Sequence, residues 1–428
     1  MEIRNSKQDT SHGFQRRASG RAAEPGSRVR TRGIVSALTT AVIASIALTG
    51  CATNTSAPTP ASGAGRSVTS HTAPGAIRTG TASTGTVRAA IDVARSTTAG
   101  TPSPNVVTTA AVSTAEHGKG VSPGGVYEST INRMSASGAL SVFTDMRSVG
   151  VQWVRLDYNY AGSVSAHGGA SDQTIQQARK AGLDVTVVLG DGTTTMPESA
   201  GFTAKNGWLT SSVKRLASMG VHHFEVGNEV NLGAQWGGKA NPTAYVGLLK
   251  TVHPIIHAAD PSAVVLMAGM APYGKQAPGS VAQGNNYNPI DFIRQLYKQG
   301  GHGSFDAVNL HPYTYPAMPT AADGGYNMLS VLPDLLALMK QQQDASMRIW
   351  WTESGMPTGP DGGYPTYTVA QQQQTITGLF QVAAKYPQVG PVFLYDWQDG
   401  GVDGDFGLYT SSHQKKASYA TFAAATAK

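Results

Sequence analysis

The sequence predicts an α/β fold, a single (β/α)8 TIM barrel in which eight parallel strands alternate with helices. From residue 138 onward, short apolar runs alternate with helix-like segments. The runs are nearly continuous in apolar character, as in parallel strands that are covered by helices on both faces. The links after the runs are longer than the links before them, as expected where strand-to-helix loops build the functional face of a barrel.

Seven strands and eight helices can be placed in order along the chain. The apolar runs predict strands over 151–158, 183–190, 222–228, 263–269, 306–312, 348–354 and 391–397. Helices are expected near 131–149 and over 171–182, 205–219, 241–259, 288–299, 327–343, 367–386 and 413–426. The remaining strand should come first, within 105–123, where no apolar run marks it. An open doubly wound sheet is the alternative, but no Gly-rich phosphate-binding loop follows an early strand to favour it.

Residues 1–50 have the organisation of a signal peptide. An apolar run over 34–49 follows three closely spaced arginines and is closed by small residues. The run ends in Leu-Thr-Gly before Cys51, which resembles the lipobox of bacterial lipoproteins. The resemblance implies that Cys51 is lipidated, with palmitate among its acyl groups, and anchors an extracytoplasmic protein to the membrane. An ordinary signal peptide or an uncleaved membrane anchor is the alternative.

Composition separates the rest of the chain into a tether and a folded domain. Residues 51–104 are rich in Thr, Ser, Ala, Gly and Pro, so they predict a flexible tether. Residues 105–428 predict the barrel. The net charge of +6 arises mostly in the leader, where residues 1–51 hold eight basic and three acidic side chains. No basic domain remains, so nucleic acid is not an expected partner.

The sequence predicts neither a metal ion nor a cofactor. Cys51 is the only cysteine, which excludes an internal disulfide framework and a cysteine-based zinc site. His253 and His257 are four residues apart on a predicted helix, the spacing that lets two histidines share a metal ion. The sequence offers no evident third ligand, and Pro254 shares their turn.

Two glutamates lie where predicted strands meet polar loops on the functional face. Glu229 follows the run FEVGN, and Glu353 follows IWWT. A pair of carboxyl groups suits glycoside hydrolysis, in which one protonates the leaving oxygen while the other attacks the anomeric carbon or activates water. The alternative is that both are ordinary helix-cap or loop carboxylates.

The two glutamates and their neighbours resemble the signature of the clan A glycoside hydrolases. Asn228-Glu229 after a fourth strand and Glu353 after a seventh are the motifs that carry the resemblance. It implies a retaining mechanism with Glu229 as general acid/base, Glu353 as nucleophile and Asn228 on the sugar 2-hydroxyl. The stretch from residue 224 to 269 is most similar to family 39, with some similarity to family 5. Gly227 and Val230 stand where the commoner motif has Trp and Pro.

The same resemblance extends to residues on other strands. Arg155, placed at the end of the second strand, matches the arginine that keeps the nucleophile ionised and is expected to lower its pKa. His311 and Tyr313 match a sixth-strand pair, with the tyrosine near the nucleophile. Trp397 matches an aromatic platform after the eighth strand. Trp236, in the loop after the acid/base, is a further candidate for stacking on a sugar ring.

The expected function is therefore that of a retaining glycoside hydrolase. It would cleave O-glycosidic bonds, β-linked by expectation, in an extracellular or cell-envelope polysaccharide. A retaining mechanism places the carboxyl groups about 5–5.5 Å apart. The chain is expected to act as a monomer. Two alternatives stay open: a non-catalytic carbohydrate-binding lipoprotein, and a transglycosylase that uses the same residues.

Overall fold

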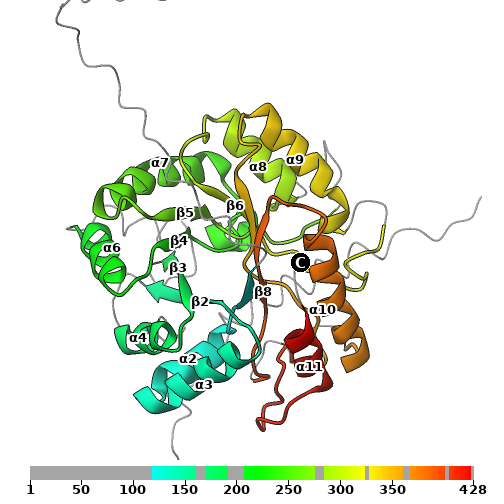
Figure 1. Ribbon diagram of the computed structural model, residues 1–428. Helices are drawn as coiled ribbons and strands as arrows, with labels where there is room; N and C mark the ends of the chain where they lie inside the picture. The colour runs from blue at the N-terminus through cyan, green and yellow to red at the C-terminus, as the bar shows by residue number, and fades with distance from the viewer. Residues whose placement is uncertain are drawn as a thin grey trace, which may run out of the picture.

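The computed structural model is a closed barrel of eight parallel strands in chain order, which confirms the predicted fold (Figure 1). It describes residues 118–159, 170–190, 207–274, 284–322, 327–359, 366–400 and 404–425. The predicted signal peptide, Cys51 and the tether lie outside the described residues.

The strands fall within or beside the predicted runs. They are β1 Lys119–Val121, β2 Trp153–Asn159, β3 Asp184–Gly190, β4 His223–Val226, β5 Val264–Met267, β6 Ala307–Leu310, β7 Arg348–Trp351 and β8 Val389–Leu394. The first strand lies inside the predicted window and closes the barrel against β2 and β8. It has only three residues. Its central Gly120 leaves room for the Phe393 ring, which would lie 2.4 Å from an added Cβ.

Helices surround the strands as an outer ring (Figure 1). They are α2 Gly125–Arg133, α3 Ala136–Ser148, α4 Asp172–Lys180, α6 Trp208–Ser218, α7 Pro242–Ala259, α8 Pro289–Lys298, α9 Leu332–Gln341, α10 Val369–Ala383 and α11 Ala417–Ala424, with short 3₁₀ turns η2 Gly233–Trp236 and η3 Met328–Val331. Side-chain caps begin several of them. Asn241 accepts a hydrogen bond from the Ala244 amide at the start of α7, and Thr368 and Gln371 form a capping box at the start of α10.

One predicted helix is two in the structure. The segment expected as a helix near 131–149 begins earlier, as α2, and is interrupted at Met134 and Ser135. Ser135 has an extended backbone, and its hydroxyl accepts a hydrogen bond from the Gly138 amide at 3.2 Å. Its side chain therefore starts a new helix, α3, instead of continuing the previous one.

The barrel interior changes from apolar to ionic along its axis. Near the N-terminal ends of the strands, Trp153 on β2 packs edge-on against Trp350 on β7, with ring centroids 5.0 Å apart. One layer higher, Arg155 on β2 forms an ion pair across the interior with Glu225 on β4. Trp351, next to Trp350, instead belongs to the core between strands and helices. Because side chains alternate along a strand, only one of these two neighbouring tryptophans faces the barrel interior.

Across the residues that the structure describes, no helix combines the length and apolar character needed to cross a membrane.

Candidate active site

Glu229 and Glu353 lie on the same face of the barrel, directly after the C-terminal ends of β4 and β7. Glu229 is buried, with 1% of its surface exposed, and Glu353 retains 9%. Glu229 has a left-handed backbone, with φ of 48°, and its amide donates a hydrogen bond to the Gly269 carbonyl at 3.0 Å. Such a conformation is costly for a residue with a side chain, and residues of this kind concentrate at functional sites.

The two carboxylates are close enough to act on one bond. An oxygen of Glu229, an oxygen of Glu353 and a ring nitrogen of His311 all lie within 4.8 Å of one another. His311 Nδ1 is 3.2 Å from Glu229 Oε1 and 3.6 Å from Glu353 Oε2. This spacing is compatible with the short separation of about 5–5.5 Å between the carboxyl groups of retaining glycosidases.

Arg155 connects the site to the barrel interior. Its Nη1 contacts Glu353 Oε1 at 2.7 Å, while Nε and Nη2 contact the two oxygens of Glu225 at 2.7 and 3.0 Å. Nη2 also donates to Asn228 Oδ1 at 2.7 Å. Arg155 lies in the interior of β2 and not at its end, because the strand continues to Asn159. Its long side chain still spans the distance to the functional face.

Residues after β6 and β7 fix the orientation of the remaining groups. Tyr313 donates its hydroxyl hydrogen to Glu353 Oε2 at 2.9 Å. His311 Nε2 lies 3.1 Å from Thr352 Oγ1, which donates to Asn309 Oδ1 at 2.9 Å. Because His311 is fully buried and held at both nitrogens, the imidazole cannot swing away from Glu229.

A glycine makes room for that imidazole. A Cβ at Gly269 would lie 2.0 Å from His311 Nε2. The chain at the end of β5 thus approaches the imidazole more closely than any side-chain-bearing residue would allow.

The two carboxyl groups have different electrostatic surroundings. Burial raises the pKa of Glu229, the charge of Glu353 raises it further, and His311 opposes the shift. Burial also raises the pKa of Glu353, against the charge of Arg155 and the Tyr313 hydrogen bond. The expected net lowering at Glu353 is therefore not found, because desolvation outweighs the arginine. Burial lowers the pKa of His311, so it stands beside Glu229 as a neutral ring.

The two predicted aromatic platforms differ in their surroundings. Trp236, in η2, is partly buried and donates its indole N–H to the Val230 carbonyl at 2.8 Å. Trp397 is fully buried and packs against Tyr409 and Tyr419, so its prediction as a sugar platform is wrong. Tyr395, two residues earlier and half-buried, instead packs against Tyr313, the hydrogen-bond donor to Glu353, with ring centroids 6.3 Å apart.

Sequence reasoning missed Thr352 and Asn309 as partners of the site. Thr352 directly precedes Glu353, and Asn309 lies two residues before His311 on an alternating strand. Inward alternation from His311 would have identified Asn309. Glu225 on β4 also belongs to this network, because it has 0% exposure and forms an ion pair with Arg155.

Among the residues that the structure describes, two groups each bring three possible metal ligands together. The first is the site itself, where the Arg155 guanidinium already neutralises Glu353 at 2.7 Å and leaves little charge for a cation. The second is His253, His257 and Asp306. The expectation that no third ligand accompanies the two histidines is therefore wrong. Asp306 is distant in sequence, and α7 continues through Pro254 without losing the spacing of the two rings.

No family model and no curated protein sequence matches this chain. Comparison with solved structures finds clan A glycoside hydrolases. A family 39 glycoside hydrolase from the gut symbiont Bacteroides cellulosilyticus WH2 has a TM-score of 0.54 and 20% identity, covering 73% of this chain and 64% of its own. A fungal β-1,4-galactanase has a TM-score of 0.51 and 18% identity, covering 72% and 99%.

A family 5 enzyme (GH5_18) from Streptomyces cattleya, solved with GlcNAc, has a TM-score of 0.50 and 14% identity, covering 73% of this chain and 80% of its own. The chain spans slightly less than two thirds of the family 39 enzyme. At these identities the likeness shows the shared fold. Families 39 and 5 are also the two that the sequence motifs resemble.

Proposed function

We propose that this protein is a retaining glycoside hydrolase in which Glu229 is the general acid/base and Glu353 the nucleophile. The observation that carries the proposal is the pair of buried carboxylates at the ends of β4 and β7, with oxygens within 4.8 Å of each other. Their partners divide the roles. Glu353 is contacted by a cation and a phenol donor, both of which favour the carboxylate, whereas Glu229 contacts a neutral imidazole.

In the first step, the Glu229 carboxylic acid gives its proton to the glycosidic oxygen while a Glu353 oxygen bonds to the anomeric carbon. The bond between that carbon and the leaving oxygen breaks, the alcohol departs, and a glycosyl ester remains on Glu353. The charge of Glu353 is thereby consumed. This removes the repulsion that raised the pKa of Glu229, which is now the anion.

In the second step, the Glu229 carboxylate takes a proton from water as the water oxygen bonds to the anomeric carbon. The ester bond breaks, and Glu353 leaves as a carboxylate. Two inversions give net retention, and both residues return to their starting protonation states. Asn228 accepts from Arg155 through its carbonyl oxygen, so its amide hydrogens remain as donors for a sugar hydroxyl.

We further propose that the substrate is a β-linked polysaccharide of the cell envelope or surroundings and that the protein is a monomer. The lipobox-like sequence at Cys51 supports a membrane anchor, and the tether after it would give the barrel reach. Partial exposure of Trp236 near the acid/base supports stacking of a sugar on this side.

The test compares the wild type with Glu229→Ala and Glu353→Ala on aryl β-glycosides and soluble polysaccharides. Dinitrophenyl glycosides need no acid to release the phenol. Glu229→Ala should therefore still form the glycosyl-enzyme with them, while Glu353→Ala should not. Added azide should give a glycosyl azide that retains the anomeric configuration with Glu229→Ala and inverts it with Glu353→Ala.

The matched control is Asp344→Asn, which alters another buried carboxylate that is paired with His302. Asp344 precedes β7, so it lies on the opposite face of the barrel from the two glutamates. It should leave hydrolysis unchanged. Full activity of Glu353→Ala would refute the proposed site. If sugars bind but no form of the protein cleaves them, the chain is a carbohydrate-binding protein. Product longer than the substrate would identify a transglycosylase.

A further inference from the structure

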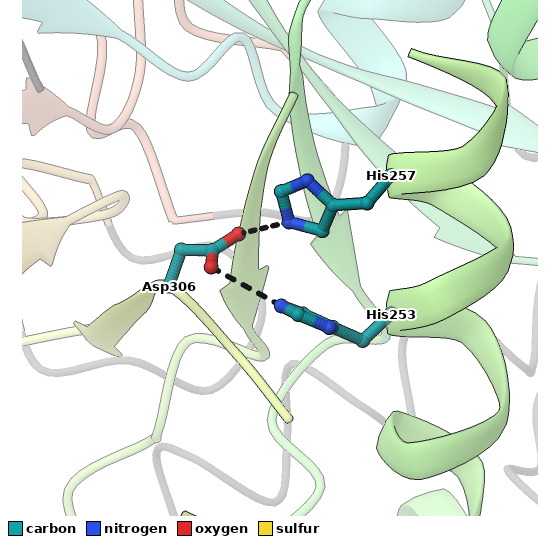
Figure 2. A group of neighbouring side chains, drawn as sticks. All are labelled: His253, His257 and Asp306. Atoms are coloured by element: carbon teal, nitrogen blue, oxygen red, sulfur yellow. Dashed lines mark hydrogen bonds and ion pairs between the residues drawn. The ribbon is translucent and has the colours of Figure 1, made fainter. Parts of the chain in front are cut away.

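A second cluster of ionisable side chains lies far from the two glutamates. His253 and His257 project from successive turns of α7 toward the carboxylate of Asp306 (Figure 2). His253 Nε2 lies 3.1 Å from Asp306 Oδ1, and His257 Nε2 lies 2.9 Å from Oδ2. One ligand atom from each residue lies within 4.8 Å of the other two.

The cluster is on the face of the barrel opposite the catalytic carboxylates. Asp306 directly precedes β6, at the N-terminal ends of the strands, while Glu229 and Glu353 follow the C-terminal ends of theirs. The histidines occupy the second half of α7, whose C-terminus leads to the start of β5. Nothing in the proposed glycosidase chemistry uses these residues.

The carboxylate of Asp306 is held in a fixed orientation. Its Oδ2 accepts a hydrogen bond from the Val265 amide at 2.7 Å, and the Asp306 amide donates to the Val265 carbonyl at 2.7 Å. Two neighbouring strands, β5 and β6, thus position the oxygen, and a helix positions both nitrogens. Metal ligands are oriented in the same way, by hydrogen bonds outside the coordination sphere.

The donor set and its spacing suit a small transition-metal ion. Two imidazole nitrogens and one carboxylate oxygen are common ligands of Zn²⁺ in sites that keep one position for water. With metal–ligand bonds of about 2.0–2.1 Å, tetrahedral geometry separates adjacent ligand atoms by about 3.3 Å. The two nitrogen–oxygen distances here, 3.1 and 2.9 Å, are within a few tenths of that value.

Solvent can reach the cluster. The side chains of His253, His257 and Asp306 retain 20%, 30% and 26% exposure. An ion could therefore enter without opening the barrel, and water could complete its coordination. We propose that His253, His257 and Asp306 form a structural site for a divalent transition-metal ion of the zinc type, which fastens α7 to the start of β6.

The competing explanation is a metal-free clamp in which both imidazoles donate hydrogen bonds to the carboxylate. The experiment separates the two. The full chain, freed of metal by chelation, is titrated with Co²⁺, whose visible absorption reports tetrahedral coordination. Zn²⁺ is bound in parallel by equilibrium dialysis, and the melting temperature is recorded with and without Zn²⁺.

We expect one equivalent of metal with tetrahedral cobalt bands. Zn²⁺ at 100 times its dissociation constant should raise the melting temperature by about 4 °C. His257→Gln, which removes one ligand, should weaken binding at least ten-fold and abolish the bands. The matched control is His302→Gln, because His302 faces a single carboxylate, Asp344, at 3.2 Å. It should bind like the wild type.

His253→Gln provides a second test in case His257→Gln folds poorly, and both variants leave the Asp306–Val265 hydrogen bonds in place. Absence of cobalt bands and of a thermal shift in the wild type would overturn the proposal in favour of the clamp. Equal affinity in wild type and both glutamine variants would overturn it as well, because the metal would then bind elsewhere.

Discussion

Replacing Arg155 with Met tests the electrostatic reasoning about the site. Arg155 contacts Glu353 and Glu225 at 2.7 Å and supplies the positive charge that both carboxylates share. With charge centres about 4 Å apart and an effective dielectric constant near 20, the attraction to Glu353 is about 4 kcal/mol. Loss of this attraction would raise the pKa of Glu353 by about 3 units. Part of this change falls on Glu225, which shares the guanidinium, so we expect a shift of about 2 units.

The assay is kcat/KM as a function of pH on whichever aryl glycoside the wild type cleaves. If Glu353 is the nucleophile, as proposed, the acidic limb reports its ionisation in the free enzyme and should move upward by about 2 pH units in Arg155→Met. The variant buries two carboxylates without a counter-ion, which costs about 3–5 kcal/mol of stability if both stay ionised. Their pKa values are then raised in the folded state, so stability falls as pH rises, and folding should be checked at each pH by circular dichroism.

The control is Arg215→Met, which removes an arginine from a half-exposed ion pair with Asp172. It should leave the acidic limb in place. If Arg155→Met is folded and its acidic limb stays within about half a pH unit of the wild type, the guanidinium does not keep Glu353 ionised. The assignment of the two glutamates would then lose its electrostatic basis.

Three further predictions follow from single contacts. Tyr313→Phe removes the hydrogen bond to Glu353, which at about 1.5–3 kcal/mol for a charged acceptor should lower kcat/KM about 10- to 100-fold without loss of fold. Gly269→Ala places a methyl group against His311 and should lower both activity and the unfolding midpoint, whereas an unchanged midpoint would show that the imidazole can move aside. Burial lowers the pKa of His223 to about 4, so its contribution to stability is present above about pH 6.5 and is lost as pH falls toward 4. Between pH 7.5 and 5 the wild type should lose about 2 kcal/mol more unfolding free energy than His223→Phe, measured by urea titration.

The repeating pattern of short apolar runs was enough to predict the barrel, because parallel strands that are buried on both faces require nearly continuous apolar sequence. The three-residue strand β1 has no such apolar run. Its central residue is Gly120, because the close approach of the Phe393 ring leaves no space for a side chain there. The break between α2 and α3 was missed for a similar reason. It depends on one hydrogen bond from the Gly138 amide to Ser135, within a segment of generally helical composition.

The sequence could predict only those site residues that follow a predicted strand or belong to a recognisable motif. Glu229 and Glu353 were recognisable because each follows a strand, and the structure places them together. Trp397 was predicted as a sugar platform from its motif after the eighth strand, but the structure packs this tryptophan against Tyr419 of α11. Asp306 could not be associated with His253, because they become neighbours only when β6 pairs with β5 and α7 packs against β5.

The layering of the interior explains why one barrel can carry both a reactive site and a stable core. Trp153 and Trp350 fill the N-terminal layer with aromatic surface, where no charge needs solvation. The Arg155–Glu225 pair above them is shielded from water on that side, so its charge acts upward on the catalytic layer with little screening. Substitutions in the lowest layer should therefore change stability without moving the pH profile of hydrolysis. Substitutions in the ionic layer should change both together, since the same guanidinium compensates the structural carboxylate Glu225 and the proposed nucleophile Glu353.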